Sequence, residues 1–253
     1  MTTTERKNTI LDQAIKLVKQ ERSCIYAEQC AFETFRESVS RARTGTGDGG
    51  TQTGHLLEEY KETVMSTPDF EAAYDESVSE SLEADFTPSL ANALQEDEPV
   101  TQQFKRNLLV AATAAIESRT RFIRALDAEH ESIRTVQKTV QDIDELLLEL
   151  PVCSLRCLPF ERFVDVWETC QDAVERCDQR SEQRQRHIAE RQTIDEYANI
   201  EAHALNGYLY DNLEAQFPAL HALAKTRRRI EQRRVRSNGP VSHIRDVNRD
   251  NCL

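Results

Sequence analysis

Apolar residues recur at every third or fourth position along most of the chain, which places them on one face of an α-helix. The pattern is most regular in the segment 100–150, where nine positions alternate steps of four and three and eight of them are apolar. A sustained heptad pattern predicts a coiled-coil-like seam on a rod about 75 Å long. The nine positions are Phe122, Leu126, Glu129, Ile133, Val136, Val140, Ile143, Leu147 and Leu150.

A second rod is predicted after the segment 150–159. This segment carries Pro151 and Pro159, and proline disrupts the interior of a helix. Two rods joined by a short break predict an antiparallel hairpin. The apolar positions that begin the second rod are Phe160, Phe163, Trp167, Cys170, Val174 and Cys177.

The remaining segments also predict helices, and none shows the alternation of a β-strand. The fold class is therefore predicted to be all-α: an elongated helical bundle with an antiparallel coiled-coil-like hairpin and a small helical head, in one domain at 1–236. The predicted elements are a helix at 3–41, a flexible linker at 42–54, short helices within 55–96, rods at 100–150 and 160–198, C-terminal helices within 199–236 and a flexible tail at 237–253.

The linker contains five of the seven glycines, and Gly45, Gly47 and Gly50 have the G-x-G-x-x-G spacing of dinucleotide-binding loops. In those folds a strand leads into the loop and the following helix points its N-terminus at the phosphates. Here a helix precedes the motif, and no Lys-Ser or Lys-Thr pair follows it. The segment is interpreted as a flexible connection, and no cofactor is expected.

The chain is acidic, with a formal net charge of −12. Residues 225–253 hold nine basic and three acidic residues, a net charge of +6, so the rest carries −18. Seven lysines stand against 25 arginines and 44 acidic residues, which favours a salt-rich cytoplasm; a generally acidic proteome is the alternative. The N-terminus is polar and the longest apolar run, 108–116, is too short to span a bilayer, so we expect a cytoplasmic protein without membrane contact.

Seven cysteines, an odd number, argue against a closed disulfide framework. Cys170 and Cys177 are one heptad apart and are expected to pack in the seam. Cys153 and Cys157 lie at the predicted hairpin tip, where they are either surface thiols or a redox pair. No further ligands are placed near them, no Glu-x-x-His pair occurs, and no histidine belongs to a nucleophile motif, so neither a metal site nor an enzyme is expected.

The run KTRRRIEQRRVR at 225–236 has two interpretations. The favoured one is a helix end whose cations stabilise exposed carbonyl groups and neutralise the acidic body. The alternative is a contact with nucleic acid or another anion. The residues that would make this contact are Arg227, Arg228, Arg229, Arg233, Arg234 and Arg236. The leading functional hypothesis is a non-enzymatic helical interaction or scaffold protein that binds a protein partner or itself, and the alternative is a nucleic-acid-associated regulator.

Two aromatic-rich stretches, 58–77 and 207–230, resemble segments of an uncharacterised family of haloarchaeal proteins of similar length. The resemblance implies a helical, salt-adapted protein and supplies no active site. We also expect 58–77 to pack against 207–220 in a small head, because aromatic residues often close the end of a bundle. The residues that carry the resemblance are Tyr60, Glu62, Thr63, Val64, Met65, Pro68, Phe70 and Tyr74 in the first stretch, and Tyr208, Leu209, Tyr210, Phe217 and Pro218 in the second.

Overall fold

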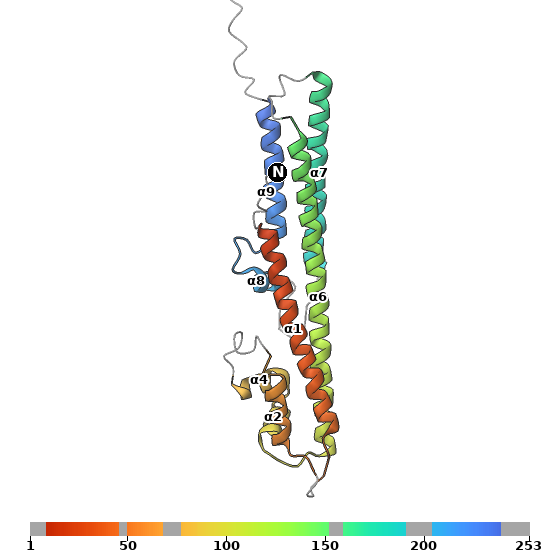
Figure 1. The fold of residues 1–253 in the computed structure, drawn as a ribbon, viewed down its shortest axis with the longest axis vertical. Helices are drawn as coiled ribbons and strands as arrows, with labels where there is room; N and C mark the ends of the chain where they lie inside the picture. Colours follow the sequence, from red (N-terminus) through yellow and green to blue (C-terminus); the bar gives the residue numbers. More distant parts are fainter. Residues whose placement is uncertain (1–8, 46–49, 68–76, 152–158, 191–203, 239–253) are drawn as a thin grey trace, which may run out of the picture. The chain divides into compact units, whose positions relative to one another are not determined.

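The computed structural model describes residues 9–45, 50–67, 77–151, 159–190 and 204–238, which form helices and no β-strand (Figure 1). This confirms the all-α prediction. The helices within these residues are α1 (Ile10–Arg41), α2 (Thr53–Thr63), α4 (Val78–Asp85), α5 (Pro88–Gln95), α6 (Gln102–Glu149), α7 (Phe160–Glu190), α8 (Ala204–Tyr210) and α9 (Pro218–Asn238).

The chain divides into two compact units. Among the described residues, the first unit, called here the hairpin unit, comprises 9–15, 131–151, 159–190 and 206–238. The second, the aromatic unit, comprises 16–45, 50–67, 77–130 and 204–205. Because α1 and α6 each contribute residues to both units, this division does not decide between one domain and two. The single domain at 1–236 stays a prediction.

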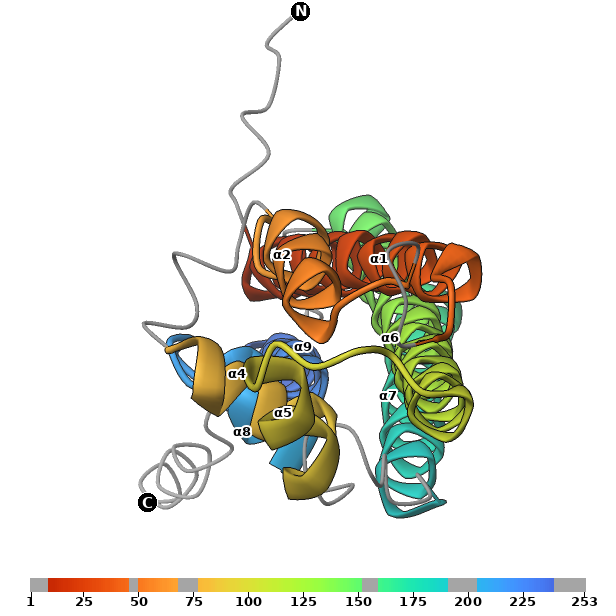
Figure 2. The same ribbon diagram turned by 90° about the horizontal axis from the view of Figure 1, so that it is seen from below.

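In the hairpin unit, α6 and α7 run antiparallel and lie side by side (Figures 1 and 2). Residues of increasing number on α7 contact residues of decreasing number on α6: Arg176 with Asp142, Arg180 with Thr139 and Arg184 with Ser132. The antiparallel pairing agrees with the prediction, whereas supercoiling of the coiled-coil type stays a prediction. One buried core cluster of this unit, where α6, α7 and α9 meet, contains Ile143, Leu147, Cys170, Ala173, Val174, Cys177 and Ile230.

Seven of the nine predicted seam positions at 122–150 are buried, and Val140 and Leu150 are partly buried. The predicted start of the α7 seam is wrong. Phe160 is 79% exposed and Trp167 is 42% exposed. The register explains this difference, since it places Glu149, the last residue of α6, level with Thr169 of α7. The preceding residues, 160–168, extend about 13 Å beyond the end of α6 and have no α6 residue opposite them. We call this segment the α7 overhang.

The aromatic unit is built around four rings, those of Phe32 and Phe35 on α1, Tyr60 on α2 and Phe86 at the end of α4. In five pairs among these rings the centroids lie 5.4 to 6.4 Å apart, in the range of favourable edge-to-face and tilted pairs. Tyr60 is one of the residues that carry the family resemblance, and it packs inside this unit. Residues 207–220 belong to the hairpin unit, so the joint packing of the two stretches stays a prediction.

The flexibility of the predicted linker at 42–54 stays a prediction, and 46–49, including Gly47, lie outside the described residues. Near its C-terminal end the linker makes backbone hydrogen bonds. The Val100 amide donates to the Thr51 carbonyl (2.9 Å), and the Thr53 amide donates to the Glu98 carbonyl (2.8 Å). Helix α2 already begins at Thr53, two residues earlier than predicted. Gly54 lies close to the Asp97 carboxylate, so a larger residue there would require this exposed side chain to shift.

Candidate functional site

The arginine-rich segment forms most of α9, and two of its arginines make ion pairs with the hairpin. Arg227 Nη1 lies 3.2 Å from Asp178 Oδ1 on α7, and its Nε lies 3.3 Å from Glu231 Oε1 on the same helix. Arg229 Nη1 lies 2.8 Å from Asp144 Oδ1 on α6. These guanidinium groups therefore connect α9 to both helices of the hairpin.

Two further arginines of α9 contact the end of the hairpin. Arg233 Nη2 donates to the carbonyl oxygens of Leu147 and Leu150, each at 3.3 Å. Leu147 lies in the last turn of α6 and Leu150 follows directly after this helix. Carbonyls at a helix end lack intrahelical partners and attract cations. The Arg234 guanidinium carbon lies 5.4 Å from the centre of the Trp167 ring, a cation–π distance.

The arginine run thus has a structural role that fits the favoured interpretation, with one change. The carbonyls that it stabilises lie at the end of α6 and not on α9 itself. Among the basic residues of α9 that the structure describes, Lys225 and Arg228 are exposed and make no hydrogen bond or ion pair. The side chain of Arg236 lies outside the described part of the chain.

The predicted redox pair, Cys153 and Cys157, also lies outside the described residues. Cys170 and Cys177 are buried in the core of the hairpin unit, as the heptad spacing predicts. Burial raises the pKa of Cys177 to about 11 and raises the pKa of Cys170 as well, so both thiols are protonated near neutral pH. Protonated, buried thiols react slowly, which suits a packing role.

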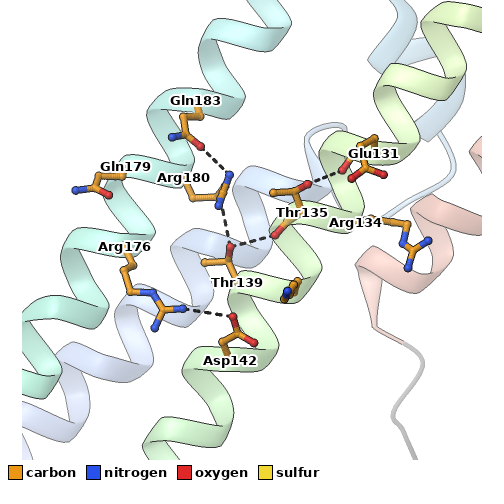
Figure 3. Close-up of a pocket in the computed structure, with 10 residues that line it drawn as sticks. Glu131, Arg134, Thr135, Thr139, Asp142, Arg176, Gln179, Arg180 and Gln183 are labelled. Carbon is orange, nitrogen blue, oxygen red and sulfur yellow. Dashed lines mark hydrogen bonds and ion pairs between the residues drawn. The ribbon is translucent and has the colours of Figure 1, made fainter.

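A polar groove runs between α6 and α7 on the hairpin unit (Figure 3). It has a volume of about 790 Å³ and a largely charged and amide-bearing lining. Arg176 lies 3.4 Å from Asp142, and Arg180 donates to Thr139 Oγ1 (3.2 Å) and to Gln183 Oε1 (2.7 Å). The lining residues are Glu131, Arg134, Thr135, Lys138, Thr139, Asp142, Arg176, Gln179, Arg180 and Gln183.

A family model described as "Domain of unknown function (DUF7260)" matches residues 9–234. The chain belongs to this family. Comparison with curated proteins found no match, and comparison with solved structures found none either. The match covers α1 to most of α9, so the arginine contacts and the groove lie within the segment that defines the family.

Two negative observations concern the part of this DUF7260 chain that the structure describes. Within it, no group of three or more histidine, cysteine or acidic residues is placed to hold a metal ion. None of its helices combines the length and the apolar character that are needed to cross a lipid bilayer.

Arg119, which the sequence pattern did not identify, is a buried arginine of the aromatic unit with several charged and aromatic partners. Its side chain is 5% exposed and lies 3.0 Å from Glu28 and 3.1 Å from Asp85. Its guanidinium carbon also lies 4.2 Å from the centre of the Phe32 ring. Asp85 accepts a hydrogen bond from the Tyr60 hydroxyl (2.7 Å), and burial near this carboxylate raises the Tyr60 pKa. Arg119 therefore connects α1, α4 and α6.

The sequence contains a signal for a buried ion pair at Glu28, although it does not identify Arg119 as the partner. Glu28 interrupts the apolar row of α1, and a charged residue within an apolar row indicates a buried or bridging ion pair. Arg184 gives a similar signal on α7, where the seam becomes polar. It is buried, donates to Ser132 Oγ (2.9 Å), and has its pKa lowered to about 10 by desolvation, so it stays charged at neutral pH.

Proposed function

We propose that this protein is a non-enzymatic helical interaction protein that associates with a second copy of itself. The observation that carries the proposal is the α7 overhang, which presents large apolar side chains beyond the end of α6. A folded protein seldom leaves such side chains together on a surface unless they meet a partner.

The overhang has the pattern of a helix-packing face. Phe160, Val164 and Trp167 are spaced by four and three residues, which places them on one side of α7. Phe160 and Trp167 are exposed and Val164 is partly exposed. Such a face suits another α-helix better than a small ligand, because it is convex and continuous along two turns.

The charges around this face favour a second copy as the partner. Arg162 and Asp165 flank it and carry opposite signs, and both are well exposed. Two overhangs that packed antiparallel about Val164 would bring Arg162 of each copy near Asp165 of the other. A two-fold contact must be self-complementary in this way. Two helical turns are fewer than a standard interface requires, so the dimer should be weak and reversible.

Replacing Phe160 with glutamate is expected to weaken this self-association at least about tenfold, because it replaces a large apolar side chain of the face with a charge. Phe160 is the first residue of α7, where an acidic side chain is compatible with the helix dipole, so folding should be unaffected. Sedimentation velocity over a concentration series measures the monomer–dimer equilibrium.

Val110→Glu is the matched control, since Val110 is 66% exposed on α6 in the aromatic unit. This control should dimerise like the unchanged chain. An unchanged chain that stays monomeric at its highest soluble concentration would contradict the proposal, and so would a Phe160→Glu variant that dimerises normally.

A nucleic-acid-associated regulator remains the alternative function, supported by the exposed Lys225 and Arg228. Removing 225–253 does not test it cleanly, because the deletion also takes the buried Ile230 out of the hairpin core. The variant Lys225→Gln, Arg228→Gln keeps the core. If α9 binds DNA or RNA, this variant loses much of a salt-sensitive affinity that the unchanged chain shows in fluorescence anisotropy.

We also infer a salt-rich cytoplasm of a haloarchaeon as the setting. The support is the excess of acidic residues and the scarcity of lysine, seven against 25 arginines. Salt screens repulsion among the many carboxylates, so the thermal unfolding midpoint should rise between low and molar KCl. An unchanged or lower midpoint in molar KCl would contradict this inference.

A further inference from the structure

We infer that the polar groove between α6 and α7 binds a small polyanion, a molecule with two or more adjacent phosphate or carboxylate groups. This site is separate from the α7 overhang and does not depend on self-association. It rests on the cations that two helices bring together and on the way in which the structure fixes them.

Four cations line the groove, two from each helix. On each helix they are four residues apart, which places them one turn apart on the same face: Arg134 and Lys138 on α6, and Arg176 and Arg180 on α7. All four cations line the groove. Figure 3 shows Arg176 and Arg180 reaching from α7 toward α6, whereas Arg134 leaves α6 on the side away from α7.

The groove also contains two carboxylates, Glu131 and Asp142, which leave it with a net charge of +2. The whole chain carries −12, so the groove reverses the sign of the protein around it. Asp142 is engaged with Arg176 at 3.4 Å. This pairing neutralises one of the four cations and at the same time holds it at the wall of the groove.

Arg180 is fixed without being neutralised. Its hydrogen bonds go to Thr139 Oγ1 and Gln183 Oε1, and neither acceptor carries a charge. Thr139 is itself buried and donates its hydroxyl to the Thr135 carbonyl at 3.0 Å. The guanidinium is therefore held in one orientation with its positive charge available, an arrangement that suits bidentate binding of an oxyanion.

The dimensions favour a small polyanion over a nucleic acid. The volume, about 790 Å³, is in the range of small-molecule sites. The lining extends from Glu131 to Asp142, about 17 Å along α6, and it contains no aromatic residue on which a base could stack. A long polyanion would extend beyond the groove and be repelled by the acidic surface around it. The binding of a small polyanion depends only on charges within about 10 Å at moderate salt.

The test is isothermal titration calorimetry of the full chain with sodium tripolyphosphate. We expect saturable binding of one molecule per chain, with an affinity that falls as KCl is raised. The double variant Arg134→Gln, Lys138→Gln should lower the affinity at least about tenfold, because it removes two of the four cations. Both side chains are exposed, so the variant should fold normally, which a circular dichroism melt verifies.

Arg124→Gln is the matched control, since Arg124 is an exposed cation of the same helix outside the groove. It should bind tripolyphosphate like the unchanged chain. The inference is overturned if the unchanged chain shows no saturable binding at low salt. It is equally overturned if the groove variant binds as well as the unchanged chain, or if Arg124→Gln loses as much affinity as the groove variant, because the attraction would then be diffuse.

Discussion

Replacing Arg119 with methionine is expected to lower the free energy of unfolding by about 3–5 kcal/mol. The Arg119 side chain is almost fully buried between Glu28 on α1 and Asp85 on α4. Methionine fills a similar volume but leaves both carboxylates without the buried cation, and an uncompensated buried charge is costly. Urea unfolding followed by far-UV circular dichroism measures the change.

Two further variants separate the charge effect from a packing effect. Arg124→Met removes an exposed cation from the same helix and should change stability by less than about 0.5 kcal/mol. Adding Glu28→Gln and Asp85→Asn to Arg119→Met should recover part of the loss, because no buried charge is then left unpaired. An Arg119→Met chain as stable as the unchanged one would show that the cluster does not hold α1, α4 and α6 together.

Replacing Ile230 with alanine should destabilise the hairpin unit by about 2–5 kcal/mol, the usual cost of emptying a fully buried aliphatic position. Ile230 of α9 is fully buried and packs in one core cluster with residues of α6 and α7. Trp167, the single tryptophan of the chain, lies in this unit beside Arg234. Its fluorescence therefore reports the urea unfolding of the hairpin unit.

Arg228→Ala provides the comparison on the same helix, since Arg228 is exposed and should cost less than about 0.5 kcal/mol. An Ile230→Ala variant with the unfolding midpoint of the unchanged chain would mean that α9 does not pack on the hairpin. In that case the contacts of Arg227, Arg229 and Arg233 would not have the structural role assigned to them here.

The helices could be predicted from the sequence because each depends on a local pattern. These patterns involve residues within one or two helical turns of each other. Examples are the heptads of α6, the proline at the start of α5 and Pro218 at the start of α9. Glu129 shows how strong the periodicity is, since this charged residue occupies a heptad position and is fully buried there. Periodicity identifies which side of a helix is buried, whatever residue stands at a single position.

The register between helices could not be predicted in the same way. Periodicity does not show that α6 ends level with Thr169, so Phe160 and Trp167 were expected in a seam that has no α6 residues opposite them. The partners of the α9 arginines come from segments some 50 to 85 positions away in the sequence. The groove has the same origin, because its lining comes from two helices that are paired in one particular register.

Helix α9, with its arginines, packs on α6 and α7 in the hairpin unit. Hydrogen exchange of the full chain, read by mass spectrometry, tests this packing most directly. Peptides from α9 around Ile230 should be as strongly protected as peptides covering Ile143 to Leu147 and Cys170 to Cys177, because one core stabilises all three. If the α9 amides exchange as fast as those of an isolated helix while α6 and α7 stay protected, the packing of α9 is contradicted.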